Sequence, residues 1–382
     1  MRHLLGRSSV QVLSLLGFVI ICAVWTVSQM DAVPIGCDGE RYLLAGRSMA
    51  LGLDPYARGG AQTYLPYPPF LAWVLELFTL ADHAWVWQLL VSLSAAVLLY
   101  ATLALAGLGA SRLTWLGTIL LAGHSFAGDI ATANVQLPVG ALLALALLAA
   151  DRKRYGTAGV FCGLAAAIKV MPALLIAFLA LRAAWSRDRR TAHAALVGAA
   201  IGAATLLTPW TRRWLELVVL GTGAGESRLS GANLSWPAFT AQAGVPLSPL
   251  VPSLLSLAAT IVVARTRRLP LLPSLAIVVA LALAGSPVAW GFTYLTVLPA
   301  IAVLLREIRR GHHFLGEVRG RGLVEYGSIL AFTMIAINAD FFYMHEVWIG
   351  RHLLPLLPLL GTLLLACTLW RTQASKPLTT GP

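Results

Sequence analysis

The chain has 382 residues, of which 58% are hydrophobic and only 12% are charged. Because soluble domains carry about a quarter charged residues, this composition excludes an ordinary water-soluble enzyme and is typical of a membrane protein. The formal net charge of +12 would suggest nucleic-acid binding in a soluble protein. In a membrane protein, arginines that collect in cytoplasmic loops explain the charge, so we expect no nucleic-acid partner.

Apolar segments of roughly 15–25 residues, separated by short basic loops, repeat along the chain. They do not alternate apolar and polar residues as the strands of a membrane barrel would. Since only helices or closed barrels satisfy their backbone groups in lipid, the sequence predicts an all-α, polytopic integral membrane bundle. The first segment, about 9–29, follows Arg2 and Arg7 and is interpreted as a retained anchor.

A polar loop over about 31–67 follows this anchor, and the short apolar segment 68–80 carries Glu76. The basic loops are placed on the inner side, and they require the span 84–108 to run inward. Because the chain is already outside before that span, 68–80 should not cross the membrane and is expected to lie along the outer surface as a juxtamembrane helix. The remaining predicted single spans are, in chain order, 84–108, 113–127, 130–150, 191–209, 250–264, 269–285, 292–305, 323–341 and 349–370.

Residues 156–185 begin and end beside basic clusters, which a single crossing cannot do. Lys169 and Pro172 lie in the middle of this segment. Because proline ends or kinks helices, we expect two short helices that meet in a turn near the outer side.

The resulting topology has about twelve crossings in a single domain over 1–382, with both termini in the cytoplasm. It places 20 of the 28 Lys and Arg residues on the inner side. The longer polar stretches, including 31–67, 124–136 and a second large loop over 210–249, then lie outside the cell membrane. No P-loop or dinucleotide fingerprint occurs on the inner side, so an enzyme of this design would receive its activated substrate through the lipid.

Several short motifs occur in a fixed order on the predicted outer side. They are CDGERYLLAGRSMALGLDPY and YLPYPPF in the first loop, ANVQLPVGALLALALL, GVFCGLAAAIKVMPALLI, ANLSWPAF and GSPVAW. Together they resemble glycosyltransferase family 87, a branch of the class C glycosyltransferases that includes polyprenyl-phosphate-mannose-dependent mannosyltransferases of the PimE type. The resemblance covers positions 38 to 290. It implies a multi-span glycosyltransferase whose donor is a polyprenyl-phosphate sugar and whose acceptor is a glycolipid or glycan.

One departure from that family concerns the end of the GSPVAW motif. The family commonly carries a His pair shortly after the Trp, whereas Trp290 is followed in this sequence by Gly291 and Phe292. Either Asp38 suffices for catalysis, or His124 or His345 takes that place, or this member has another acceptor or has lost its activity.

An inverting sugar transfer needs a base for the acceptor hydroxyl, and a partly desolvated carboxylate suits that task. Asp38, close after the first span, is the candidate base and matches the family's catalytic Asp; Glu40 is its local rival. The structural alternative is that Asp38 caps a short helix that begins near Gly39.

The leaving group would be a lipid phosphate, which requires cations. Lys169 lies at membrane depth, where a charge costs about 2.5–3.5 kcal/mol on insertion scales, and a phosphate or carboxylate partner would offset that cost. Snorkelling to the interface is the alternative. Arg228 and Arg212 are further candidates for phosphate contact, and ordinary interfacial arginines are the alternative for them.

A larger set of polar and aromatic residues could contact the sugar or the acceptor, with tryptophan stacking on a pyranose ring. The set is Glu40, Tyr42, Tyr56, Tyr67, Asn134, Asn233, Ser235, Trp236 and Trp290. For the tyrosines beside Pro55 and Pro68 a purely architectural role is the alternative. Asp129 is expected to cap a helix. The four cysteines have no metal-ligand spacing, and we expect neither a metal nor a cofactor.

These inferences converge on a membrane glycosyltransferase that transfers a sugar, which we expect to be mannose, from a polyprenyl-phosphate carrier at the extracytoplasmic face. Two other interpretations remain: a transporter or flippase for lipid-linked sugars, which would need the cations but no base, and a non-catalytic binding protein. Transporters often contain internal repeats, and none is evident in this sequence.

Overall fold

The computed structural model describes residues 37–56, 65, 67–79, 84–107, 129–219, 235–242, 244–245, 248, 250–266, 269–286, 291–312 and 356–374. All regular structure in these ranges is helical, which confirms the all-α prediction. The predicted spans 9–29, 113–127 and 323–341 and both chain termini lie outside the described residues, so the predicted number of crossings stays a prediction.

The helices follow one another along the chain with short connections in the middle of the sequence. They are α2 (Cys37–Ala50), α3 (Pro69–Thr79), α4 (Ala84–Ala106), α7 (Gln136–Asp151), α8 (Tyr155–Ile168), α9 (Ala173–Ser186), α10 (Arg189–Ala204), α11 (Thr211–Trp214), the π-helix η1 (Leu215–Val219), α13 (Trp236–Gln242), α14 (Leu250–Arg265), α15 (Leu271–Ala284), the 3-10 helix η2 (Gly291–Val297), α16 (Leu298–His312) and α20 (Leu356–Ala374).

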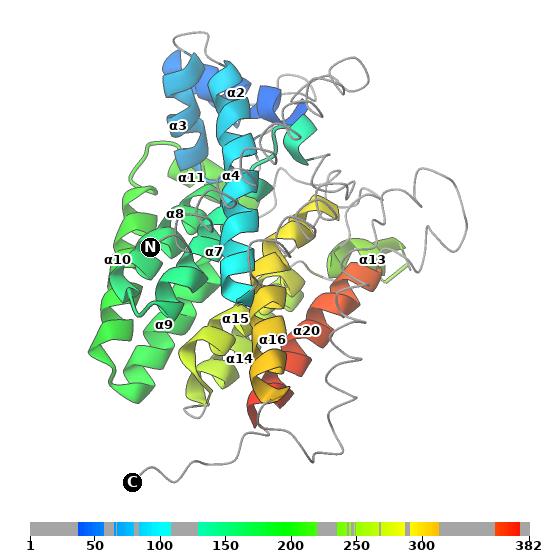
Figure 1. Cartoon of the computed structure of the whole chain (residues 1–382). Helices are drawn as coiled ribbons and strands as arrows, with labels where there is room; N and C mark the ends of the chain where they lie inside the picture. Colours follow the sequence, from blue (N-terminus) through cyan, green and yellow to red (C-terminus); the bar gives the residue numbers. More distant parts are fainter. Residues whose placement is uncertain are drawn as a thin grey trace, which may run out of the picture.

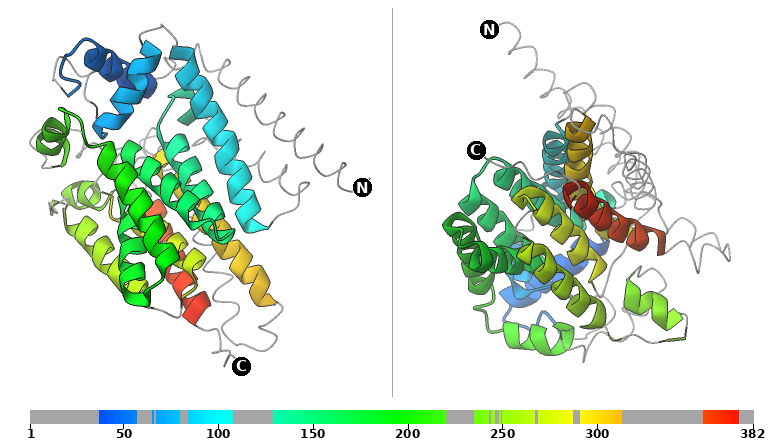
Figure 2. Two further views of the ribbon diagram at one scale, coloured as in Figure 1. Left: turned by 90° about the vertical axis from the view of Figure 1, so that its left-hand side faces the viewer. Right: turned by 90° about the horizontal axis from the view of Figure 1, so that it is seen from below.

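Helices α4, α7, α8, α9 and α10 form one side of a bundle, and α14, α15, α16 and α20 form the other (Figure 1). The short helices α2 and α3 pack on each other at one end of the bundle, beside the start of α4 (Figures 1 and 2). The first polar loop therefore contributes a helical cap to this end of the bundle.

The predicted pair of helices in 156–185 is confirmed. Helix α8 ends at Ile168, where Lys169 leaves the helical conformation with φ −143° and ψ 134°. Helix α9 starts directly after Pro172. The break therefore places Lys169 at the end of α8 with an extended backbone rather than in a helix interior.

Three predicted spans differ from the observed helices. The helix predicted over 191–209 ends at Ala204, where α10 gives way to turns. The prediction of a continuous helix over 130–150 is wrong at its start, because the chain turns with Ala133 at φ 53° and α7 begins only at Gln136. The segment 292–305 begins as the 3-10 helix η2 and becomes α-helical at Leu298. The run GFTYLTV consists mostly of aromatic, β-branched and glycine residues, which favour the α-helix weakly.

Glycines allow α8 and α10 to approach each other closely. A Cβ atom added at Gly159 would clash with the carbonyl oxygen of Ala194, and one at Gly163 would lie 2.8 Å from that of Gly198. Small residues at helix interfaces permit this backbone contact in membranes. Because Lys169 directly follows the last residue of α8, the close contact between α8 and α10 also fixes the position of Lys169 along the axis of the bundle.

Gly159→Ala should therefore destabilise the protein. We expect a loss of about 1–3 kcal/mol from overpacking and a melting temperature in detergent lower by roughly 5 °C or more. The matched control is Gly202→Ala in α10, where an added Cβ meets nothing within 4 Å. That change should leave the melting temperature unchanged or raise it, because alanine favours a helix over glycine. Equal melting temperatures for the two variants would contradict the packing argument.

Large apolar side chains are exposed on the outer faces of the bundle. They include Leu89 and Leu93 on α4 and Leu254, Leu255 and Val262 on α14. One described helix, Trp85–Ala106, is long and apolar enough to cross a membrane by itself, and the other apolar helices have 10–17 residues. Exposed apolar side chains on the outside of a helical bundle suit contact with lipid.

Candidate active site

Asp38 lies in the first turn of α2, at the end of the bundle where α2 meets the chain before α7. One oxygen, Oδ2, accepts a hydrogen bond of 2.6 Å from Nδ2 of Asn134. The other, Oδ1, lies 3.9 Å from the guanidinium of Arg41, and the side chain is 24% exposed. The carboxylate is therefore held on one side and open to an incoming group on the other.

The turn that carries Asn134 is fixed by contacts from two helices. Its carbonyl groups accept hydrogen bonds from the Gly39 backbone, from Nε1 of Trp87 and from Nε2 of Gln88, at 3.0, 3.0 and 2.6 Å respectively. A Cβ atom at Gly39 would lie 2.7 Å from Cβ of Ala133. Asp38 is thus placed by direct backbone contact between α2 and this turn.

A chain of three hydrogen bonds joins Asp38 to Lys169. From Asp38 it passes to the Asn134 amide, whose Oδ1 accepts from the backbone nitrogen of Gln136 at 3.0 Å. The side-chain oxygen of Gln136 in turn accepts from Nζ of Lys169 at 3.0 Å. The predicted base and the predicted phosphate ligand therefore lie in one connected polar network.

The environment of Asp38 favours a proton acceptor. Desolvation raises the pKa of its carboxyl group above the ordinary value, while the Asn134 hydrogen bond and the Arg41 charge lower the pKa and partly offset that effect. A carboxylate with a raised pKa is a stronger base than one in water.

Asp129 is a second carboxyl group of this site. It is fully buried, and among the described residues neither of its side-chain oxygens has a hydrogen-bond partner. The backbone carbonyl of Asp129 accepts a hydrogen bond from the backbone nitrogen of Asn134. Asp38 and Lys169 lie near enough for their charges to shift the pKa of the Asp129 carboxyl group. Burial and the Asp38 charge raise the pKa of Asp129, and Lys169 lowers it. The expectation that Asp129 caps a helix is not supported.

Three of the predicted tyrosines pack together beside the site. The Tyr42 hydroxyl donates to that of Tyr67 at 3.4 Å, and the Tyr56 hydroxyl donates to the Tyr67 carbonyl at 3.0 Å. Tyr56 is fully buried, and its backbone nitrogen donates to Asp54. These contacts favour the architectural interpretation for Tyr56, while Tyr42 and Tyr67 lie close enough to Asp38 for its charge to act on them.

Other candidates lie apart from this network. Arg212 is 91% exposed and pairs with Glu216 at 2.8 Å, and the neighbouring Arg213 pairs with Asp54 at 3.0 Å. Glu40 is exposed on α2, Ser235 is buried and Trp236 is partly buried at the start of α13. Within the described residues the Asp38 carboxylate contacts Asn134 and Arg41 rather than any of these side chains. The remaining candidates, which lie outside the described residues, are Arg228, Asn233, Trp290, His124 and His345.

Sequence reasoning did not identify Gln136, which joins Asn134 to Lys169. It is fully buried, and its Nε2 has no partner among the described residues. A polar residue directly before the apolar run LPVGALLALALL was the available signal, because glutamine is rarely buried without a specific partner. Within the described part of the chain, no group of three or more His, Cys, Asp or Glu residues is arranged to hold a metal ion.

Asn134→Leu should shift the pH dependence of activity. The substitution removes a hydrogen bond that lowers the pKa of Asp38, so this pKa rises and more alkaline solution is needed to ionise the base. Hydrogen bonds to charged groups contribute about 1.5–3 kcal/mol, which corresponds to an upward shift of about 1–2 pH units in the acidic limb of kcat/KM. If the acidic limb of the kcat/KM profile does not move, the group whose ionisation controls activity is not the one that Asn134 hydrogen-bonds, and the assignment to Asp38 is contradicted.

Known proteins similar to this chain include two solved structures and one sequence family. The structures are crystal structures of ArnT from Cupriavidus metallidurans, one bound to undecaprenyl phosphate and one in the apo state, with TM-scores of 0.43 and 0.41. In both cases the identity is 17%, and the alignment covers 94% of this chain and 77% of the other. No curated protein matches the sequence. The sequence profile of glycosyltransferase family 87 matches residues 64–318, more than half of the chain. This membrane protein therefore belongs to glycosyltransferase family 87.

Proposed function

We propose that the protein transfers a sugar, mannose in the first instance, from a polyprenyl-phosphate donor to a hydroxyl group of a glycolipid or glycan. The observation that carries this proposal is the hydrogen-bonded connection between Asp38 and Lys169. It joins a candidate base and a candidate phosphate ligand in the same network, as the reaction requires.

In the proposed reaction the acceptor oxygen attacks the anomeric carbon of the sugar. Asp38 takes the proton of the acceptor hydroxyl, a bond forms between the acceptor oxygen and the anomeric carbon, and the bond from that carbon to the phosphate oxygen breaks. The polyprenyl phosphate leaves with the additional negative charge. We assign the stabilisation of this charge to Lys169. Among the described residues no carboxylate oxygen lies within ion-pair distance of its Nζ, although the buried Asp129 carboxyl is near enough for the two groups to interact electrostatically.

The charge distribution supports an extracytoplasmic location for the site. Helices α7 and α8 run in opposite directions, so Gln136 and Lys169 lie at one end of the pair and the turn Arg152–Arg154 lies at the other. Helices α9 and α10 meet at that second end with Arg187 and Arg189. Because positive loops favour the cytoplasm, we place Asp38 on the opposite side.

The test is a transfer assay with purified protein in detergent and a polyprenyl-phosphate mannose labelled in the sugar. We expect polyprenyl phosphate to be released only when a glycolipid acceptor is present, with the label recovered in the acceptor. A flippase would instead move the intact donor across a vesicle membrane without releasing the phosphate. Transport of intact donor combined with no release would overturn the proposal.

A further inference from the structure

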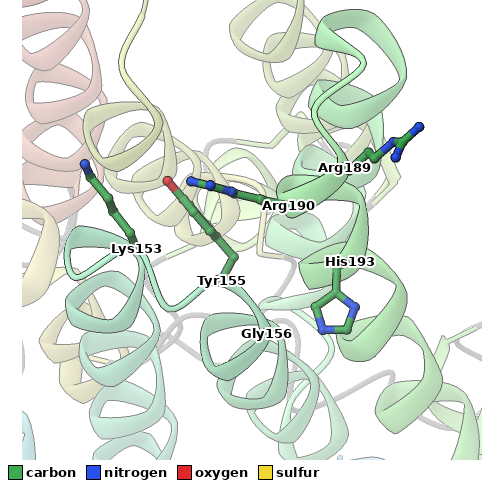
Figure 3. A pocket seen from close by; sticks show the side chains of 6 residues that line it. All are labelled: Lys153, Tyr155, Gly156, Arg189, Arg190 and His193. Carbon is green, nitrogen blue, oxygen red and sulfur yellow. The ribbon is translucent and has the colours of Figure 1, made fainter.

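A basic pocket lies at the other end of the bundle from Asp38. It has a volume of about 380 Å³ and is lined by Lys153, Tyr155, Gly156, Arg189, Arg190 and His193. Its residues come from the turn between α7 and α8, the first turn of α8 and the first two turns of α10 (Figure 3). The proposed transfer reaction uses none of them.

The positive charges of this pocket are largely unneutralised. No described carboxylate oxygen lies within ion-pair distance of Lys153, Arg189 or Arg190. The nearby Asp151 pairs with Arg306 at 2.7 Å. The other nearby acid, Asp188, accepts hydrogen bonds from the Arg190 backbone and the Thr191 hydroxyl as the cap of α10, and the Arg190 charge is among the causes that lower its pKa.

The start of α8 adds backbone donors to this charge. The first N–H groups of a helix have no acceptor within the helix, and the N-cap residue of α8, Arg154, makes no side-chain bond to them. Gly156 in this turn has no side chain, and a Cβ atom there would lie 3.1 Å from Nε2 of His193. An uncapped helix N-terminus beside cations is suited to a phosphate group.

The surroundings of the pocket indicate a lipid as the source of that phosphate. Figure 3 shows the polar ends of Lys153, Tyr155 and Arg190 gathered on one side of the pocket, with His193 beside Gly156 on the other. One turn further along the same face of α10, Leu196 is 69% exposed. An exposed leucine beside a basic pocket at the end of a membrane bundle offers contacts to an acyl chain and a headgroup together.

We propose that this pocket binds the phosphate group of an anionic membrane lipid. Lys153, Arg190 and the Tyr155 hydroxyl contact the phosphate together with the free N–H groups of α8, and the acyl chain extends along α10 past Leu196. The proposal is independent of the transfer reaction, because the pocket and the Asp38 network lie at opposite ends of α7 and α8.

Native mass spectrometry of the protein in a neutral detergent tests the proposal, with phosphatidylglycerol titrated against phosphatidylcholine. The double variant Lys153→Gln, Arg190→Gln should weaken phosphatidylglycerol binding roughly tenfold or more, since each basic residue near a membrane surface contributes substantially to binding anionic lipid. The matched control, Arg152→Gln with Arg154→Gln, removes the same charge from the same turn outside the pocket and should change binding less than about threefold. An equal loss in the control would overturn the pocket as the site.

Two further experiments test whether the shape of the pocket matters as well as its charge, and whether the bound phosphate belongs to a lipid. Gly156→Leu fills the pocket without changing any charge and should also weaken lipid binding roughly tenfold, provided that the exposed His193 ring, 3.1 Å from a Cβ atom at this position, turns aside. The melting temperature of this variant shows whether it stays folded. Glycerol phosphate and inorganic phosphate should not displace the lipid at equal concentration. If either competes as well as phosphatidylglycerol does, the ligand is a water-soluble phosphate and the lipid proposal is wrong.

Discussion

Replacing Asp38 with asparagine should lower kcat for sugar transfer by about 10²–10⁴, the usual contribution of general base catalysis. The amide cannot take the proton of the acceptor hydroxyl, yet its oxygen can still accept the hydrogen bond from Asn134 that holds the native side chain. We therefore expect the variant to fold and insert normally and to bind donor with little change. The measurement is single-turnover transfer with saturating donor and acceptor.

Glu40→Gln is the comparison for this experiment, because Glu40 lies two residues away on α2 and is exposed. As an acceptor contact it should affect mainly KM for the acceptor, by about tenfold or less, and leave kcat near the wild-type value. If Glu40→Gln loses kcat and Asp38→Asn keeps it, the base is Glu40 and the assignment to Asp38 is wrong.

Lys169→Met should lower kcat by about 10²–10³, the loss typical of removing one group that stabilises developing charge on an oxygen. Lys169 donates to Gln136, a neutral acceptor, at 3.0 Å, and no described carboxylate lies within ion-pair distance of its Nζ. Methionine preserves the length of the side chain and removes the charge. The rate of donor cleavage in a single turnover and KM for the donor are the quantities to compare.

Arg154→Met is the matched control for Lys169→Met, since it also removes one positive charge, from the opposite end of α8. It should retain activity within about twofold. A similar loss in both variants would show that the effect follows the net charge of the protein and not the position of Lys169. Raising the pH should not restore Lys169→Met, because no titratable group remains at that position.

The helical membrane class and the break between α8 and α9 could both be predicted from the sequence, as could the polar character of the region around Asp38. The break was predictable because Pro172 and the flanking basic clusters act locally. The start of α7 could not be predicted from apolar length alone, because the turn before it depends on bonds from Trp87 and Gln88, more than forty residues away.

The role of Gln136 likewise could not be predicted from the residues that neighbour it in the sequence. Its partner Lys169 is 33 residues away in the chain, and the partners Asn134 and Asp38 are separated by 96 residues. A single sequence shows that these residues are polar but not which of them meet. The cap predicted for Asp129 failed for the same reason, since only the packed structure shows that its carboxyl group is enclosed without a partner among the described residues.

The glycine beside the proposed base has a practical consequence for redesign. Because Gly39 leaves no room for a side chain against Ala133 and Trp87, mutant libraries that vary position 39 should yield few active clones. The solvent-facing positions of the same helix, Glu40 and Arg47 among them, can be varied without disturbing that contact. Directed evolution of new acceptor preferences is therefore best started there, with the proposed base Asp38 left in its native setting.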